Sequence, residues 1–213
     1  MASRNLMWGV LAGAVLAVPL CWSGLKDSKH NFQSASWNPS GQVCLPCHTP
    51  HNASKVAAAP LWNHDETTAV FILYDSDTLT APVVNQPSGV SKTCLGCHDG
   101  TVALNAFGGN TGSSEFLRSG PAFLGTNLSN DHPISFIYDT KLAADDGGLY
   151  DPKVTIVPLL DGQTIQKGML IKDEIQCTSC HDVHAVRSPA SQGGGMLLLS
   201  NNGSALCLTC HRK

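Results

Sequence analysis

Hydrophobic residues form only one long run in this chain, at its beginning. Apolar residues dominate positions 7–20, after a single basic residue, Arg4, and before the small residue Ser23. That order is typical of a secretory signal peptide, because about 14 apolar residues fall short of the roughly 20 needed to span a bilayer. We therefore predict a signal peptide over residues 1–23. A membrane anchor and a lipid-modified Cys21 are weaker alternatives.

Beyond that run the apolar stretches are short and are separated by turn-forming residues. Three have the composition of short strands: Ala69–Tyr74, Ile134–Tyr138 and Val154–Leu160. A helical turn is expected over Asp173–Gln176, and a loop over the Gly-rich stretch 108–125. The pattern predicts one domain over residues 24–213, mostly coil with short helices and few short strands, and no membrane span in the mature chain.

The composition is unusual for a globular domain. Charged residues make up 14% of the chain and aromatic residues 6%, whereas there are 20 glycines and 12 prolines. Such a chain has little side-chain volume with which to build a large core, so another source of apolar bulk is expected. The formal net charge is −3 with no run of Lys or Arg, which argues against nucleic-acid binding.

The cysteines carry the strongest signal for function. Eight of the nine fall in four copies of Cys-x-x-Cys-His, the attachment motif of c-type haem. Two thiols bond to the vinyl groups of one porphyrin, and the adjacent His then reaches the iron. The predicted attachment residues and proximal ligands are Cys44, Cys47 and His48 (motif 1), Cys94, Cys97 and His98 (motif 2), Cys177, Cys180 and His181 (motif 3), and Cys207, Cys210 and His211 (motif 4).

Disulfide bridges and zinc sites are the alternative explanations of these cysteines. A disulfide across two residues is strained and suits a structural role poorly, and zinc does not require a His after each second Cys. We therefore predict four covalent haems c. The four macrocycles would replace the missing aromatic core, which makes this a haem-organised multihaem cytochrome c with helical turns at its motifs.

Five histidines remain to complete the iron coordination. They are His30, His51, His64, His132 and His184, whereas the only methionines after the signal are Met169 and Met196, for which packing roles are expected. We predict bis-histidine ligation of all four irons. His64 has acidic neighbours and is expected to be solvated, so the predicted distal ligands are His30, His51, His132 and His184.

Two of these histidines follow a proximal histidine by three positions. His51 lies three residues beyond His48, and His184 three beyond His181. Side chains at this spacing are neighbours on a helical turn, whereas two ligands on opposite sides of one iron lie much farther apart. Each must therefore reach a different haem, which would hold neighbouring haems close together, as in an electron relay.

Ligation by histidine on both sides leaves no iron position for a substrate, so electron transfer is favoured over catalysis. No hydrolytic motif or phosphate-binding loop is present. The prediction is a protein that is not an enzyme. A multihaem oxidoreductase acting on nitrogen or sulfur oxyanions is the alternative from a different class.

Several sequence segments in and between the motifs resemble those of the outer-surface multihaem cytochromes of metal-reducing bacteria. They are Cys-His-Thr-Pro-His-Asn at 47–52, Ala-Pro-Leu-Trp-Asn at 59–63, Cys-Leu-Gly-Cys-His-Asp-Gly-Thr-Val-Ala at 94–103, Asn-Asp-His-Pro-Ile-Ser-Phe at 130–136 and the C-terminal Cys-Leu-Thr-Cys-His at 207–211. The resemblance covers most of the mature chain. It implies a stacked chain of haems wrapped in coil, location outside the cell or on its outer surface, and other redox proteins or extracellular acceptors as partners.

Tetrahaem members of that family form extracellular filaments, so a homopolymer with head-to-tail contacts is expected. Motif 4 lies close to the end of the chain, where little sequence remains to supply a ligand. We expect His51 of one protomer to complete the fourth haem of the next, with a reach to the second haem of its own chain as the competing assignment. A monomeric periplasmic electron shuttle is the alternative to a filament.

Overall fold

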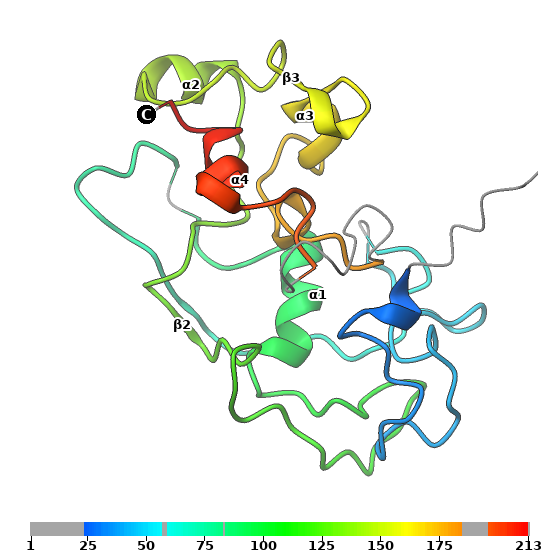
Figure 1. The fold of residues 1–213 in the computed structure, drawn as a ribbon. Coiled ribbons are helices and arrows are strands. Elements are labelled where there is room, and N and C mark those ends of the chain that lie inside the picture. Colours follow the sequence, from blue (N-terminus) through cyan, green and yellow to red (C-terminus); the bar gives the residue numbers. More distant parts are fainter. Residues whose placement is uncertain (1–23, 57–58, 83, 185–195, 213) are drawn as a thin grey trace, which may run out of the picture.

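The computed structural model describes residues 24–56, 59–82, 84–184 and 196–212, and most of this chain is coil (Figure 1). The helices are short: α1 (Gly89–His98), α2 (Thr140–Asp146), α3 (Ile165–Met169) and α4 (Ala205–Leu208). Single 3-10 turns occur at Leu25–Asp27 (η1), Pro158–Leu160 (η2), Cys177–Ser179 (η3) and Asn202–Ser204 (η5). The predicted fold class, coil with short helices and few short strands, is confirmed.

Two small sheets account for the strands of the described residues. β1 (Ile72–Leu73) pairs in parallel with β2 (Asn127–Leu128), so that Ile72 lies opposite Asn127. β3 (Ile156–Val157) and β4 (Gln163–Thr164) form an antiparallel pair. Two predicted strands are therefore present in shortened form, and the second ends where Pro158 begins a 3-10 turn.

Two local predictions were wrong. The segment Ile134–Tyr138 forms no strand, only an isolated bridge between Ile137 and Glu174. Its Ser135 has φ of 66°, in the left-handed region that interrupts an extended strand. Likewise, Asp173–Gln176 is not a helical turn, because Lys172 and Asp173 both have positive φ, 53° and 66°, in a tight turn between Ile171 and Glu174.

Ordinary capping chemistry explains where α2 and α3 begin. The side chain of Asp139 accepts a hydrogen bond from Leu142 N at 2.8 Å at the start of α2, and Gly147, with φ of 71°, ends that helix. At α3 the hydroxyl of Thr164 accepts from Lys167 N at 3.4 Å. These caps satisfy backbone N–H groups at the beginning of two helices that are only 7 and 5 residues long.

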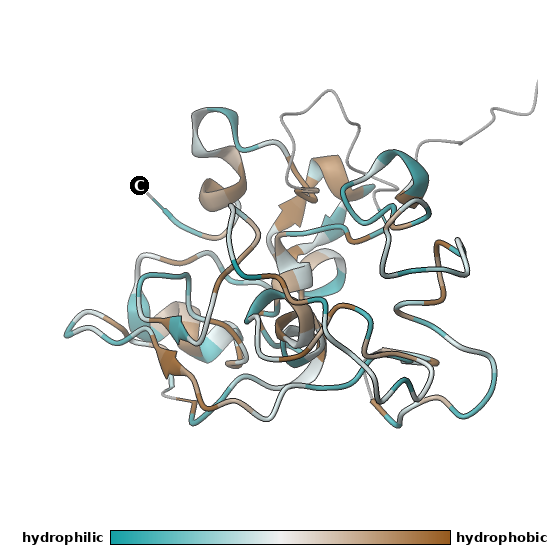
Figure 2. Cartoon of the chain, turned by 90° about the horizontal axis from the view of Figure 1, so that it is seen from below, coloured by the Kyte–Doolittle hydropathy of each residue, from teal (hydrophilic) through white to brown (hydrophobic). Residues whose placement is uncertain are grey.

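Buried apolar side chains gather in the C-terminal half of the chain. The larger cluster includes Tyr138, Leu160 and Ile165, and Cys180 and Cys210 pack against it. A smaller cluster of Phe71, Leu95 and Leu128 lies between α1 and the β1–β2 pair. Apolar and polar segments otherwise alternate along the ribbon (Figure 2), which fits a chain whose side chains make only part of its core.

The predicted signal peptide, residues 1–23, lies outside the described residues. Among the residues that the structure does describe, no helix is long and apolar enough to cross a membrane.

Candidate functional site

All four motifs have the same local conformation, one helical turn. The backbone N–H of the motif histidine donates to the carbonyl oxygen of the first cysteine, at 2.8 Å for His48, 3.0 Å for His181 and 3.0 Å for His211, and motif 2 forms the end of α1. Residues three and four apart on such a turn lie on one side. Both sulfurs and the imidazole of each motif are therefore presented to the same side, as attachment to one porphyrin requires.

The eight motif cysteines are free thiols in the described chain. None of these eight cysteines is paired in a disulfide with another of the described residues. Between residues 24 and 212, leaving aside the undescribed stretches, no group of three or more His, Cys, Asp or Glu side chains is arranged to hold a metal ion. A zinc site of the usual four-ligand kind thus has no support in the geometry of these residues.

The thiols of successive motifs are neighbours. Burial and the nearby Cys47 raise the pKa of Cys97 to about 12. A hydrogen bond between Cys94 and Cys177 raises the pKa of Cys94 and lowers that of Cys177 to about 7. Burial and the nearby Cys180 raise the pKa of Cys210 to about 12.

These neighbours connect motif 1 to motif 2, motif 2 to motif 3, and motif 3 to motif 4. The attachment points therefore follow one another in space in the same order as in the sequence. Such an order suits a relay, because each porphyrin would have a neighbour on the way to the next.

The segment 63–65 lies between motif 1 and motif 2. Asn63 N donates to Cys47 O at 3.0 Å, and its side-chain amide donates to Leu45 O at 2.6 Å. On the other side, a Cβ atom at Gly96 would come within 2.9 Å of Asp65 O, so only glycine fits this approach without a shift. The segment therefore contacts motif 1 through two hydrogen bonds and motif 2 through close packing against Gly96.

Three pairs of histidine rings lie at similar separations, with angles between the ring planes of 55° for His30 and His98, 20° for His48 and His184, and 74° for His132 and His211. The ring centres are 5.9 Å apart for His30 and His98, 6.2 Å for His48 and His184, and 6.3 Å for His132 and His211. Two imidazoles bound through nitrogen at about 2.0–2.1 Å to opposite sides of one metal ion have ring centres roughly 6 Å apart. Each pair joins one motif histidine to one spare histidine, so the residues fit a haem iron held between two imidazoles.

Hydrogen bonds orient several of these rings. Nδ1 of His48 lies 2.8 Å from Pro60 O, Nδ1 of His98 lies 2.7 Å from Ala122 O, and Nδ1 of His132 lies 2.8 Å from Pro133 O. A carbonyl oxygen can only accept, so Nδ1 carries the proton and Nε2 is left with its lone pair. This tautomer is the one that a metal requires when it binds through Nε2.

The neutral form of the His30 ring, which metal binding requires, is favoured by burial. Burial lowers the pKa of His30 to about 4, with further contributions from His98, His181 and His184. Burial disfavours the charged imidazolium, and only the neutral ring can bind a metal.

His64 is the spare histidine whose environment was predicted wrongly. It was expected to be solvated, but it is only 2% exposed. Its Nδ1 donates to Asp65 O at 2.8 Å, and its Nε2 lies 3.5 Å from Cys97 Sγ. Its imidazole is therefore buried beside motif 2, an environment that its acidic sequence neighbours concealed.

The remaining expected ligand, His51, is exposed, and Thr49 Oγ1 donates to its backbone carbonyl at 3.0 Å. Met169 is 4% exposed and belongs to the larger apolar cluster, which confirms its predicted packing role.

Two buried polar atoms of the described chain have no hydrogen-bond partner, Trp62 Nε1 and Thr178 Oγ1. Buried polar groups are almost always paired, so each of these atoms points to an acceptor supplied by something else. The Trp62 ring meets the His48 ring edge-on at 6.2 Å, and Thr178 lies between the two cysteines of motif 3. A porphyrin carries carboxylates that can accept from such groups, so both orphaned atoms agree with haem beside these motifs.

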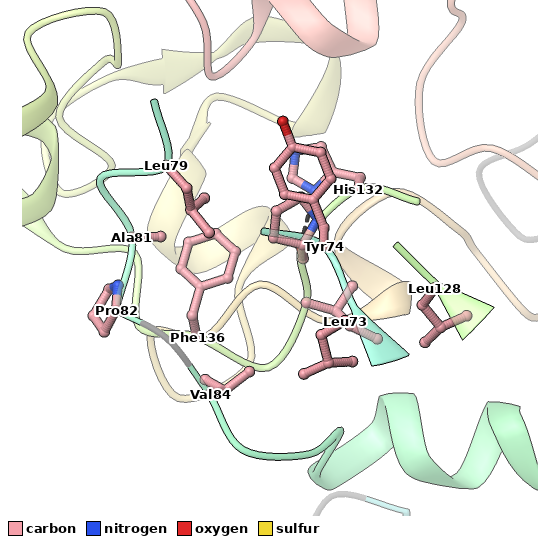
Figure 3. A pocket seen from close by; sticks show the side chains of 11 residues that line it. Leu73, Tyr74, Leu79, Ala81, Pro82, Val84, Leu128, His132 and Phe136 are labelled. Atoms are coloured by element: carbon pink, nitrogen blue, oxygen red, sulfur yellow. Dashed lines mark hydrogen bonds between the residues drawn. The ribbon is translucent and has the colours of Figure 1, made fainter. Parts of the chain in front are cut away.

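A small apolar cavity of about 40 Å³ adjoins His132 (Figure 3). It is lined by Leu73, Tyr74, Leu79, Ala81, Pro82, Val84, Leu128, His132, Pro133, Ile134 and Phe136. The cavity has room for a few water molecules and is much smaller than a macrocycle. Its residues instead form an apolar wall behind the His132 ring.

Comparison with known families agrees with this chemistry. A model described as a doubled CXXCH motif matches residues 170–213, which contain motifs 3 and 4. The doubled motif indicates covalently bound c-type haem. The match supports a multihaem c-type cytochrome, in which haem serves electron transfer. No curated protein matches the chain closely enough to count as a relative.

Proposed function

We propose that the protein is a four-haem cytochrome that transfers electrons, with every iron bound by two histidines. The observation that carries the proposal is the set of three facing ring pairs, each joining a motif histidine to a spare one. When bound, haem supplies the group that accepts and releases one electron. The chain's own residues hold the porphyrins in order, occupy the axial positions and exclude other ligands.

The distal assignments follow from these pairs. His184 serves the haem of motif 1, His30 that of motif 2 and His132 that of motif 4. In this proposal His132 takes the place that was expected for His51 at the fourth haem, because the ring centres of His132 and His211 are 6.3 Å apart. His64 has its Nε2 against the sulfur of Cys97. His51 is then the donor left for the haem of motif 3.

We further propose that His51 acts between protomers, giving a head-to-tail extracellular filament. Its side chain is exposed and faces outward from the described chain. A contact in which one surface of a protomer binds a different surface of the next is heterologous, and such contacts build filaments when they do not close. The haem count and order resemble those of the tetrahaem filament cytochrome OmcE. In such a filament, the electron acceptors of the present protein would lie outside the cell.

The first experiment measures haem content and filament formation together. Denaturing mass spectrometry of the mature protein is expected to give the polypeptide mass plus four haems, and negative-stain microscopy of the secreted fraction is expected to show filaments. Fewer than four haems in a host with a complete haem-attachment pathway would refute the tetrahaem proposal. Four haems on a protein that remains monomeric would identify a shuttle.

Substitution of His132 tests the axial assignment. His132→Ala is expected to convert one of the four haems to a high-spin form that binds cyanide, because one iron loses an imidazole. His64→Gln is the control, since glutamine can still donate to Asp65 O, and it should leave every haem low-spin. Absorption spectra in the visible region with and without cyanide distinguish these outcomes. A fully low-spin His132→Ala protein would exclude His132 as a ligand.

A further inference from the structure

We propose that the buried pair Ser91 and Gln176 sets the separation of the second and third porphyrins and thereby the electronic coupling between them. The inference rests on the proposed four-haem function and concerns two residues outside the Cys-x-x-Cys-His motifs. Ser91 lies in α1, three residues before Cys94, and Gln176 immediately precedes Cys177.

The two residues join the motif-bearing turns by reciprocal hydrogen bonds. Ser91 N donates to Gln176 Oε1 at 2.8 Å, and Cys177 N donates to Ser91 Oγ at 3.0 Å. Ser91 is 0% exposed and Gln176 1% exposed. Each bond runs from a backbone N–H of one motif-bearing turn to a side chain of the other, so neither turn can slide without breaking one of them.

Gln176 is itself held from several sides. Its side-chain amide donates to Glu174 Oε2 at 2.8 Å, and its backbone N–H donates to Ser179 Oγ at 3.0 Å. At the start of α1, a Cβ atom on Gly89 would come within 3.2 Å of Gln176 Nε2, and the φ of Gly89 is +57°. A Cβ atom at position 89 would therefore require the Gln176 amide to shift by a few tenths of an ångström.

The hydrogen bonds of Ser91 and Gln176 lie next to cysteines that attach the second and third haems. As free thiols, Cys94 and Cys177 lie within hydrogen-bonding reach, so one attachment sulfur of motif 2 is beside one of motif 3. Once both sulfurs are thioethers neither has a hydrogen to donate, and the bonds of Ser91 and Gln176 remain to join the two turns. Figure 1 shows α1 at the centre of the fold with the orange segment that contains motif 3 beside it. Each porphyrin is bonded twice to its own turn, so fixing the turns fixes the porphyrins. Coupling between two porphyrins decreases steeply with their separation.

The test uses the mature holoprotein and the circular dichroism of its Soret band. Coupled porphyrins give a split signal whose amplitude falls as they move apart. Ser91→Ala removes the acceptor for Cys177 N, and Gln176→Met removes the acceptor for Ser91 N with little change in length. Both variants are expected to keep four haems by mass spectrometry and to lose part of the split signal.

Ser135→Ala is the matched control. The hydroxyl of Ser135 is also buried and accepts from Ser88 N at 3.0 Å at the beginning of α1, but this bond does not reach motif 3. Its spectrum should equal that of the parent protein. An unchanged split signal in Ser91→Ala and Gln176→Met would overturn the proposal.

Loss of haem from Ser91→Ala and Gln176→Met alone would also overturn it, because the pair would then be needed to form the holoprotein and not to set a distance. Absence of haem from the parent protein would instead refute the proposed function.

Discussion

Removing the thiols of motif 3, by Cys177→Ala together with Cys180→Ala, is expected to give a mature protein that is lighter by one haem and whose relay is interrupted in the middle. Cys94 is hydrogen-bonded to Cys177, and Cys180 is a neighbour of Cys210. Motif 3 therefore has a neighbouring motif on both sides. Loss of the third haem therefore removes two contacts between neighbouring porphyrins and separates the first two haems from the fourth.

The corresponding change in motif 1, Cys44→Ala with Cys47→Ala, is the matched control. It also removes two cysteines and one haem, but the thiols of motif 1 neighbour those of motif 2 alone among the contacts described above, whereas the thiols of motif 3 neighbour those of motifs 2 and 4. Three contiguous haems should remain. Mass spectrometry counts the haems, and the split Soret signal should fall more in the motif 3 variant than in the motif 1 variant.

Two results would contradict this expectation. A motif 3 variant that still carries four haems would show that these cysteines do not attach one. Equal losses of the split signal in both variants would show that the haems do not follow the order of the motifs.

His51→Ala is expected to abolish filaments and to leave three low-spin haems and one high-spin haem. The reason is that an exposed imidazole donated to a neighbouring protomer would be both a metal ligand and the chemical link between subunits. Removal of a coordinate bond from each of many identical contacts weakens the polymer at every joint. Microscopy measures the polymer, and absorption spectra measure the spin state.

Lys55→Ala is the control for this experiment, because Lys55 is an exposed residue near His51 that is no iron ligand. It should leave both filaments and spin state unchanged. Filaments with four low-spin haems in His51→Ala would refute the bond between protomers. A monomeric His51→Ala protein with four low-spin haems would make His51 a surface contact only, and its place on the third iron would then be wrong.

Much of the site could be predicted from the sequence because attachment is local. Two thiols and a histidine within five positions need only one helical turn to reach the same side, and such a turn forms at every motif. The fold class was equally accessible, since a chain with 6% aromatic residues and many glycines and prolines cannot build a large side-chain core. The surplus of histidines over methionines also identified the candidate axial ligands.

The pairing of those histidines was decided by the tertiary structure. His48 faces His184 and His98 faces His30, residues far apart in sequence whose approach depends on how the intervening coil is folded. His64 looked solvated from its acidic neighbours, yet contacts with motif 2 bury it. Ser135 interrupts a strand that its apolar neighbours predicted, because its φ of 66° lies in the left-handed region. Residue type and spacing determine which groups can bind haem, whereas the contacts between distant segments determine which groups meet, because no local preference encodes a distance across the fold.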